Sequence, residues 1–345
     1  MKKLNNKTIL ITGGRGSFGK KMIQIVLTNC KPKRLIIFSR DELKQFEMGQ
    51  KWNPNKYPCL EYVLGDVRDK DRLNRVFEGV DYIIHAAALK QVPAAERNPV
   101  EYIKTNIVGA INIIDAAISN NVKKVIALST DKACNPVNLY GATKLCSDKL
   151  FVAANTAIHG DRTKFAVVRY GNVLGSRGSV IPFFQERVKT GVLPITDDRM
   201  SRFWITLDQA VHFVIASLDR SKGGEIFVPR IPSMKITDLA KAIGPECKQE
   251  VVGIRPGEKV HEVLISEDEA RNTVKFSECF IVQHNEMFKK DLLKYKGELC
   301  SSDFRYSSDN NVDLMSVDEL KVLVEKIVDD YSIESSRWAM DDVPE

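Results

Sequence analysis

Short apolar runs recur through the first part of the chain, and segments with a helical spacing of apolar residues separate them. Each run has the length of a buried strand, and the five runs lie at 8–11, 34–38, 61–64, 81–84 and 125–128. The intervening segments with the period of an amphipathic helix include 20–28, 71–77 and 100–120. This alternation predicts an α/β fold built on a doubly wound, parallel sheet of the Rossmann type.

The alternation continues through a helix expected at 144–158 and a strand at 165–169, and then it breaks down. Beyond it the pattern predicts a strand at 223–228 and four helices, at 182–189, 207–218, 236–243 and 317–331. We therefore expect a sheet domain over residues 1–170, to which the core returns in part after 205. We expect residues 171–335 to form mainly a smaller C-terminal lobe, and 336–345 to form a polar tail.

A glycine-rich turn joins the first predicted strand to the first predicted helix. It reads T-G-G-R-G-S-F-G from Thr12 to Gly19, and three of its glycines are spaced three residues apart. Glycines at this place let the backbone approach a pyrophosphate, which binds at the N-terminus of the helix. We predict a dinucleotide site rather than merely a tight turn, with contacts from Gly13, Arg15, Gly16, Ser17, Phe18 and Gly19.

The end of the second strand indicates which dinucleotide binds. NAD-specific sites usually have an acidic residue there, which holds the ribose 2′-hydroxyl. Here Ser39 and Arg40 come before Asp41, and Arg15 in the glycine turn and Lys44 supply further positive charge. These cations suit the 2′-phosphate of NADP, so the sequence favours NADP over NAD. The alternative for Arg40 is a solvated loop charge.

Two further strand ends complete the predicted cofactor site. Asp66 and Val67 follow the third strand, where the carboxylate can accept a hydrogen bond from the adenine amino group. Ala86 and Ala87 follow the fourth strand, and their small side chains let the backbone pass close to a cofactor. Lys90 lies just beyond them, within reach of phosphates if the loop folds inward.

A tyrosine and a lysine four residues apart follow the fifth strand. If Tyr140 opens a helix, Tyr140 and Lys144 share one face, and the ammonium can lower the pKa of the phenol. A phenolate can take the proton of an alcohol. Thr130, Asp131 and Lys132 stand at the strand end, where open α/β sheets bind their ligands. The alternative for Tyr140 and Lys144 is a pair of unrelated surface residues, and the alternative for Asp131 and Lys132 is a simple ion pair.

His85 and Asn106 are polar residues in predicted elements that are otherwise apolar. A lone histidine at a strand end is usually a packed residue, so His85 is given no chemical role. Asn106 lies inside the helix predicted at 100–120, where asparagine is intrinsically disfavoured. It is either structural or holds a water near the pair formed by Tyr140 and Lys144.

Two arginine-rich segments in the second half of the chain predict anion binding. Arg199 and Arg202 flank Met-Ser beside aromatic residues, which suits contacts to phosphates and stacking on a base. Arg255 and Glu258 belong to a charged loop that could form a second clamp. The alternative is a pair of surface arginines.

Composition narrows the class of protein. The net charge of +6 comes without a long basic run, which argues against nucleic acid as a partner. No apolar run approaches the roughly 20 residues of a membrane-spanning helix, and no signal peptide is visible, so no membrane insertion is expected. The seven cysteines are scattered, with no C-x-x-C pair. This pattern predicts a reduced, cytoplasmic location and no structural metal.

The motifs resemble those of the inverting UDP-N-acetylglucosamine 4,6-dehydratases, which belong to the extended short-chain dehydrogenase/reductases. The resemblance covers about residues 7–265 and extends weakly to the helix near 330. Its most specific segments are S-R-D-E-L-K from Ser39, H-A-A-A-L-K from His85, S-T-D-K-A from Ser129, L-Y-G-A-T-K from Leu139, R-Y-G-N-V-L-G-S-R-G-S from Arg169, R-M-S-R-F-W-I from Arg199 and R-P-G-E-K from Arg255. Retaining relatives carry Asp-Glu where this chain has Asp131 and Lys132.

The resemblance implies a reaction and a role for each residue. Tyr140 takes the proton of the 4-hydroxyl of UDP-N-acetylglucosamine while hydride passes to NADP, and Lys144 and Thr130 assist. Lys132 then removes the hydrogen at carbon 5, and Asp131 protonates the leaving 6-hydroxyl. The product begins the synthesis of pseudaminic acid or a related surface sugar. The implied substrate contacts are Lys90, Asn172, Arg199, Arg202, Arg255 and Glu258, and the implied assembly is a homo-oligomer, with a hexamer as one option.

Two other functions stay open. A nucleotide-sugar 4-epimerase or reductase of the same superfamily would use Tyr140 and Lys144 but would not need Asp131 and Lys132. A non-catalytic protein that senses dinucleotides would need none of these four side chains. Their joint presence speaks against the second of these alternatives.

Overall fold

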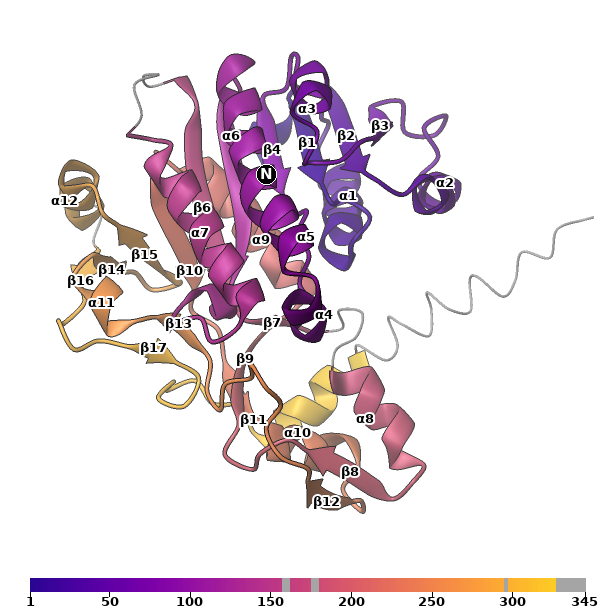
Figure 1. Ribbon diagram of the computed structural model, residues 1–345, viewed down its shortest axis with the longest axis vertical. Helices are drawn as coiled ribbons and strands as arrows, with labels where there is room; N and C mark the ends of the chain where they lie inside the picture. The colour runs from indigo at the N-terminus through magenta and orange to yellow at the C-terminus, as the bar shows by residue number, and fades with distance from the viewer. Residues whose placement is uncertain (157–161, 175–179, 295–296, 327–345) are drawn as a thin grey trace, which may run out of the picture. The chain divides into compact units, whose positions relative to one another are not determined.

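The computed structural model describes residues 1–156, 162–174, 180–294 and 297–326 (Figure 1). The chain forms two compact units. The first contains Met1–Gly171, Leu207–Arg230 and Val263–Tyr306, and the second contains Asn172–Thr206, Ile231–Glu262 and Ser307–Glu345. The segment 263–306 therefore belongs with the sheet and not with the C-terminal lobe, where we had expected it. The predicted tail at 336–345 lies outside the described residues.

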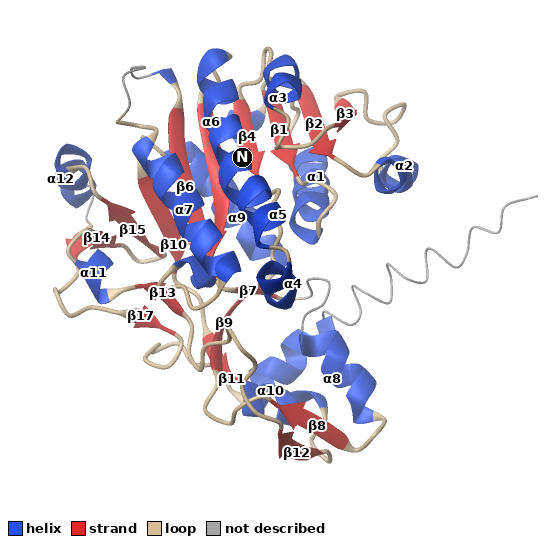
Figure 2. Ribbon diagram, in the orientation of Figure 1, coloured by secondary structure: helices blue, strands red, loops and turns tan. Residues whose placement is uncertain are grey.

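A ten-stranded sheet forms the core of the first unit, in the order β16-β14-β15-β10-β6-β5-β4-β1-β2-β3 (Figure 2). The strands from β10 to β3 in this order pair in parallel, and their bounds are β10 Glu225–Pro229, β6 Lys164–Tyr170, β5 Lys124–Thr130, β4 Tyr82–His85, β1 Thr8–Thr12, β2 Arg34–Ser39 and β3 Leu60–Leu64. Three antiparallel strands extend the sheet: β15 Cys279–Gln283, β14 Thr273–Lys275 and β16 Glu298–Leu299. The predicted α/β fold with a mostly parallel sheet is confirmed.

Helices cover both faces of this sheet, which is why β1 and β10 are buried along their whole length and β5 along most of it. One face is covered by α3 (Lys70–Val76), α6 (Gly109–Ser119) and α7 (Leu139–Ala153), and the other by α1 (Ser17–Asn29) and α9 (Leu207–Arg220) (Figure 1). None of the described helices is long and apolar enough to cross a membrane.

The helix predicted at 100–120 is confirmed, and it contains a π-helical segment that we did not predict. The chain forms α5 (Pro99–Tyr102), the π-helix η2 (Ile103–Val108) and α6 without a break. The wider π turn places Asn106 in the interior, where its amide bonds both backbone groups of Leu89. A single inserted turn changes the hydrophobic period little, so the sequence pattern did not show it.

The remaining short elements of the first unit lie at its edges and loops. They are η1 (Lys2–Leu4), α2 (Glu42–Lys51), α4 (Val92–Arg97), η3 (Asp131–Ala133), β13 (Val263–Ile265), α11 (Glu267–Ala270) and α12 (Glu286–Lys294). Strand β17 (Tyr306–Ser307) lies at the boundary between the two units. Several of these elements have four residues or fewer, and we predicted none of those.

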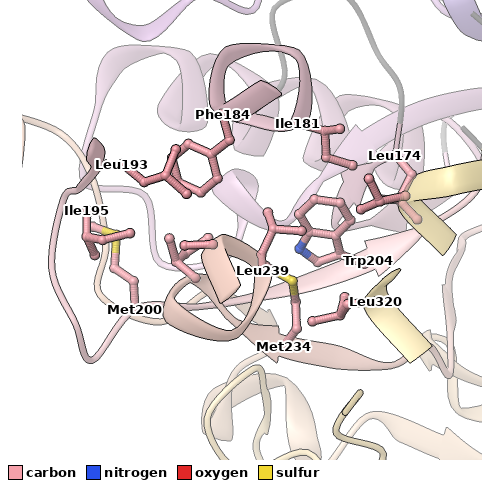
Figure 3. Close-up of a cluster of buried hydrophobic side chains, with 13 residues drawn as sticks. Leu174, Ile181, Phe184, Leu193, Ile195, Met200, Trp204, Met234, Leu239 and Leu320 are labelled. Atoms are coloured by element: carbon pink, nitrogen blue, oxygen red, sulfur yellow. The ribbon is translucent and has the colours of Figure 1, made fainter. Parts of the chain in front are cut away.

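The second unit has a small apolar core of its own. Its elements are β7 (Asn172–Val173), α8 (Val180–Val188), β8 (Val192–Ile195), β9 (Ser201–Ile205), β11 (Ser233–Lys235), α10 (Ile236–Ile243), β12 (Lys248–Val251) and a helix at 317–326. Figure 3 shows Trp204 of β9 packed among apolar side chains from α8, α10 and the late helix, with Leu239 and Leu320 close to it. The predicted helices at 182–189 and 236–243 correspond to α8 and α10. The end of the helix predicted at 317–331 lies outside the described residues.

Candidate active site

The glycine-rich turn between β1 and α1 is packed tightly against its neighbours. Gly13 has φ +66°, and a Cβ there would lie 2.8 Å from the backbone nitrogen of Ala87. A Cβ on Gly19 would collide with the carbonyl oxygen of Gly14, so α1 reaches the turn only because position 19 has no side chain. Gly16 is the N-cap of α1, and its lack of a side chain leaves the first helical N–H groups available to a phosphate. This cradle fits a pyrophosphate.

Replacing Gly19 with alanine should therefore damage the dinucleotide site and the fold together. The added methyl group must push α1 away from the turn, and overpacking of this kind costs about 1–3 kcal/mol. We expect a lower melting temperature and weaker binding of the dinucleotide than in the parent. Gly49→Ala in α2 is the control, because its Cβ would meet only Tyr62 at 3.8 Å. Equal behaviour of the two variants would contradict this account of the turn.

Asp41 draws together two of the cations that we predicted for a 2′-phosphate. As the N-cap of α2 it accepts a hydrogen bond from the Lys44 backbone N–H (3.0 Å). Its carboxylate also pairs with Arg15 (3.1 Å) and with the Lys44 ammonium (3.3 Å). The backbone hydrogen bond, with the two cations, holds the pKa of Asp41 below its usual range. Arg15 and Lys44 thus lie close enough to act on one anionic group, while Ser39 is buried and bonded to Gln45 (2.9 Å).

Asp66, which follows β3, pairs with two further arginines. Arg68 donates to its carboxylate through the side chain (2.7 and 2.9 Å) and the backbone N–H (3.0 Å), and Arg40 lies 3.4 Å away. Burial raises the pKa of Asp66, but Arg68 and then Arg40 outweigh it and the pKa lies below its usual range. Sequence reasoning missed Arg68, two residues after Asp66. Val67 is buried, and a Cβ on Gly109 would lie 2.8 Å from it.

His85 is packed below the turn that carries Ala86 and Ala87. Its Nδ1 shares a hydrogen bond with Thr12 Oγ1 (2.8 Å), which also accepts from the Ala87 backbone N–H (3.2 Å). Burial, followed by the charge of Lys144, lowers the pKa of His85 to about 3. The imidazole is therefore neutral at physiological pH, and it fixes the alanine loop against β1.

Asn106 of η2 fixes the loop that carries Lys90. Its side-chain amide donates to Leu89 O (2.9 Å) and Thr143 Oγ1 (3.0 Å), and its Oδ1 accepts from Leu89 N (2.9 Å). Lys90 is exposed, yet its pKa lies below the usual value, because nearby protein atoms displace part of its solvent and because Lys132 is close. The hydrogen bonds of Asn106 support the structural interpretation of this residue.

Thr130, Asp131 and Lys132 form one hydrogen-bonded group at the carboxyl end of β5. Thr130 Oγ1 donates to Asp131 Oδ1 (2.9 Å) and accepts from the Lys132 backbone N–H (3.3 Å). The Lys132 ammonium donates to the same Oδ1 (3.0 Å), and the Asp131 side chain is 1% exposed against 26% for Lys132. Asp131 Oδ2 has no hydrogen-bond partner within the described parts of the chain.

The start of α7 packs directly on this group. Asn138 is the N-cap and accepts a hydrogen bond from the Gly141 N–H (2.8 Å). A Cβ on Gly141 would collide with the carbonyl oxygen of Lys132, so only glycine allows the helix to approach η3 this closely. Tyr140 is thereby brought to Thr130, with which its phenol is hydrogen-bonded. We did not predict Gly141, because the contact that requires it becomes visible only in the folded chain.

Burial determines the charge of the Tyr140 phenol. Tyr140 is 9% exposed, and burial raises its pKa to about 12, while the Lys132 ammonium and the hydrogen bond with Thr130 act in the opposite direction. We expected Lys144 to be the cation that favours the phenolate, and the structure differs. Lys144 is buried beside Asp148, and burial lowers its own pKa while Asp148 opposes that change. In the protein by itself, Tyr140 is therefore neutral at physiological pH.

Arg202 in the second unit is bonded to the backbone around it. Its side chain is 11% exposed, and its guanidinium donates to the carbonyl oxygens of Ser201 (2.7 Å), Val260 (2.9 Å) and Lys259 (3.0 Å). The Glu262 carboxylate lies 3.7 Å from it. These bonds hold the loop 259–262 in place. A direct contact of Arg202 with phosphate stays a prediction, and it would have to replace some of these bonds.

The other predicted anion-binding residues of the second unit are more exposed. The side chains of Arg199 and Arg255 are 68% and 67% exposed, and they pair with Asp197 (2.8 Å) and Glu258 (3.8 Å) respectively. Asn172, in β7, is also exposed. An exposed ion pair such as that of Arg255 with Glu258 contributes little stability, so Arg255 can leave it and turn toward a ligand. Part of the R-Y-G-N-V-L-G-S-R-G-S motif, residues 175–179, lies outside the described residues.

Comparison with known proteins identifies relatives over most of the chain. Residues 9–284 match the family described as polysaccharide biosynthesis protein. The inverting UDP-N-acetylglucosamine 4,6-dehydratase of Campylobacter jejuni is 56% identical over 316 residues, which are 89% of this chain and 94% of that protein. The UDP-glucose 4-epimerase of Rickettsia conorii is 44% identical over 272 residues, 76% of this chain and 79% of that protein.

A solved structure gives the same result for the fold. The structure of Pen from Bacillus thuringiensis superimposes with a TM-score of 0.83 at 36% identity, covering 94% of this chain and 98% of that one. The motif-based resemblance to the inverting dehydratases is confirmed at the level of the family. The chain belongs to the polysaccharide biosynthesis protein family, and within it the chain is similar to the inverting UDP-N-acetylglucosamine 4,6-dehydratases.

Proposed function

We propose that this chain is a UDP-N-acetylglucosamine 4,6-dehydratase that inverts carbon 5. The contact between η3 and the start of α7 carries the proposal, because it brings Asp131 and Lys132 against Tyr140. Oxidation at carbon 4 needs one base, whereas loss of water needs a second base and an acid. This site offers all three groups. The name and 56% identity of the C. jejuni relative support the same assignment.

Tyr140 acts in the first half of the proposed reaction. Its phenolate takes the proton of the 4-hydroxyl, Thr130 hydrogen-bonds the 4-oxygen, and the Lys144 ammonium holds the nicotinamide ribose. The raised pKa of Tyr140 means that the phenol needs a further positive charge nearby before it ionises at neutral pH. When bound, the oxidised nicotinamide supplies that charge, accepts a hydride from carbon 4 and later returns it to carbon 6.

Lys132 and Asp131 act in the second half. The 4-ketone acidifies the hydrogen at carbon 5. When Lys132 passes its own proton to Asp131 within their ion pair, the neutral amine can remove that hydrogen and the protonated Asp131 can give its proton to the leaving 6-hydroxyl. Return of a proton from solvent to the opposite face of carbon 5 inverts that centre. The product is UDP-2-acetamido-2,6-dideoxy-β-L-arabino-hex-4-ulose, which we place at the first step of pseudaminic acid or related surface-sugar synthesis. The ion pair of Asp131 and Lys132 (3.0 Å) keeps both groups at one end of β5.

We propose NADP as the cofactor, in agreement with the backbone cradle at Gly13 and Gly16. Arg15 and Lys44 converge on one carboxylate and can turn from it to a 2′-phosphate, whereas Arg40 would have to leave Asp66. Protein purified without added nucleotide should retain NADP(H), because the redox cycle closes on itself.

The Arg15→Ala variant tests this preference for NADP. A hydrogen bond to a charged group contributes about 1.5–3 kcal/mol, so we expect about ten- to a hundredfold weaker NADP binding, with NAD binding unchanged. Titrations of both nucleotides by protein fluorescence measure the two affinities. Arg75→Ala, an exposed arginine of α3, is the matched control. Recovery of NAD(H) alone from denatured protein, with no preference for the 2′-phosphate form, would contradict the assignment.

For the uridine diphosphate we propose Arg255, Glu258, Arg199 and Asn172 as direct contacts. Arg202 then contributes mainly by holding the loop 259–262, as its three bonds to backbone oxygens indicate. Lys90 is proposed to bind phosphate in the first unit. We also propose a cytoplasmic homo-oligomer. Its supporting observations are the scattered cysteines and the exposed apolar residues Val100, Ile103, Val108 and Ile111 along α5, η2 and α6.

Mass spectrometry of the nucleotide product tests the proposed function. Incubation with UDP-N-acetylglucosamine should give a product lighter by one water. A product of unchanged mass that migrates as a 4-epimer would instead favour the second candidate, a 4-epimerase, for which the name of the R. conorii relative is the supporting observation. Tight binding of nucleotide with no product would favour the non-catalytic, dinucleotide-sensing alternative.

A further inference from the structure

A chain of buried charged side chains runs from the catalytic helix to the C-terminal part of the first unit. Asp148 of α7 accepts a hydrogen bond from Ser129 (2.7 Å) and pairs with Arg169 of β6 (3.4 Å). Arg169 in turn donates to both carboxylate oxygens of Glu269 of α11 (2.9 and 3.1 Å) and to Leu264 O (3.0 Å). The side chains of Asp148 and Arg169 are each 1% exposed.

The first link of this chain is to Lys144. Asp148 lies four residues after Lys144, so both side chains are on one face of α7. A buried ammonium needs a counter-charge, and the charge of Asp148 opposes the loss of the Lys144 proton that burial favours. His85, which faces Lys144 from β4, is neutral and adds no counter-charge. Asp148 is therefore the anion that favours the charged form of Lys144.

Asp148 depends on Arg169 for its own charge. Burial raises the pKa of Asp148, and Arg169 is the strongest of the groups that oppose this change, ahead of Lys144 and Ser129. Arg169 lies between two carboxylates, so its charge is shared between Asp148 and Glu269. With all four groups ionised, the charges of Lys144, Asp148, Arg169 and Glu269 sum to zero.

Glu269 also touches the second catalytic segment. The Cys134 thiol donates to its Oε2 (3.7 Å), and Cys134 directly follows η3, which contains Asp131 and Lys132. The position of Glu269 is fixed by a capping box with Ser266 at the start of α11. One carboxylate from the C-terminal part of the chain thus contacts the supports of both halves of the site.

We propose that Glu269 is a positioning residue of the active site, which acts on Lys144 through Arg169 and Asp148 and on η3 through Cys134. The proposal rests on the proposed function for the role of Lys144. It assigns a task to the segment 263–270, which lies at the end of the region covered by the motifs. A buried ion-pair network is by itself weak evidence for stability, so the chain of contacts calls for a functional test.

The pH dependence of NADP affinity in Glu269→Gln provides that test. Glutamine keeps the shape and removes the charge, so the environment of Lys144 becomes more positive and its ammonium loses a proton at lower pH. Affinity that depends on charged Lys144 falls as pH rises, and in the variant this fall should move down by on the order of one pH unit. Glu269→Asp should restore most of the shift. Glu267→Gln, an exposed neighbour on α11, should leave it unchanged.

Two measurements separate a positioning role from a structural one. If Glu269→Gln lowers the free energy of unfolding but leaves the pH profile of NADP affinity in place, the proposal is overturned. If that variant does not fold, Ser129→Ala removes one hydrogen bond from Asp148 and should shift the profile in the same direction, and no shift would overturn the proposal. Because binding needs no turnover, the result stands even if UDP-N-acetylglucosamine is not dehydrated, which would refute the proposed function alone.

Discussion

Replacement of Lys132 by alanine is expected to stop the loss of water while it leaves the first hydride transfer measurable. Lys132 is the proposed base at carbon 5, and removal of one acid or base typically costs about a hundred- to ten-thousandfold in rate. The structure adds a second effect, because the Lys132 ammonium is the cation that lowers the pKa of Tyr140. The first half-reaction should therefore slow by about tenfold near neutral pH and recover as the pH rises.

Lys132→Arg separates these two effects. The guanidinium keeps a positive charge beside Asp131 and Tyr140 but stays protonated, so it cannot act as a base. This variant should reduce its bound cofactor at nearly the parental rate in stopped-flow absorbance and still form almost no 4-keto-6-deoxy product. Near-parental product formation by Lys132→Ala would refute the role of Lys132. Failure of both variants to reduce the cofactor, although they fold and bind UDP, would place Lys132 in the first step or in the scaffold.

Replacement of Tyr140 by phenylalanine should block the reaction one step earlier. The phenolate of Tyr140 is the proposed base for the 4-hydroxyl, so its loss should reduce the rate of cofactor reduction by about a hundred- to ten-thousandfold. The ring can stay packed with Ala95 and Tyr102. We therefore expect little change in the melting temperature or in the affinity for UDP.

Tyr102→Phe is the matched control for Tyr140→Phe. Tyr102 belongs to the same apolar cluster, is 3% exposed, and donates a hydrogen bond to Gln91 O (2.7 Å). Its loss should cost about 1 kcal/mol of stability and leave the hydride step intact. If Tyr140→Phe reduces the cofactor as fast as Tyr102→Phe does, the phenol is not the base.

Periodicity was sufficient to predict the part of the fold that contains the expected dinucleotide site. The strands β1, β2, β4 and β5 contain continuous apolar runs, because helices cover both faces of the sheet, and the glycine turn lies between β1 and α1 where motif spacing placed it. Strands of two or three residues, such as β14 and β16, have too few positions to show a period. Strand β15 is long enough to be recognised, but it pairs with β10 in antiparallel orientation and stands outside the βα alternation, so 263–306 was not predicted to extend the sheet.

The supports of the site were harder to predict than the residues that carry chemistry. Tyr140, Lys144, Asp131 and Lys132 lie within one short segment and follow a buried strand. Glu269 is more than a hundred residues away and reaches this segment only through the folded chain. Asp148 could have been predicted from the sequence, because a charged residue one turn beyond Lys144 on a buried helix face needs a counter-charge. The backbone bonds of Arg202 were also not predicted, since arginines beside aromatic residues suit backbone oxygens as well as phosphates.

Proton NMR of the product formed from UDP-N-acetylglucosamine in deuterated water tests the central claim most directly. The proposed mechanism removes the hydrogen at carbon 5 and replaces it from solvent, while hydride from carbon 4 completes a new methyl group at carbon 6. We therefore predict a methyl signal free of deuterium, one solvent deuterium at carbon 5, and the inverted configuration at that carbon. A 4-epimer that keeps its 6-hydroxymethyl group and its original hydrogen at carbon 5 would contradict the account.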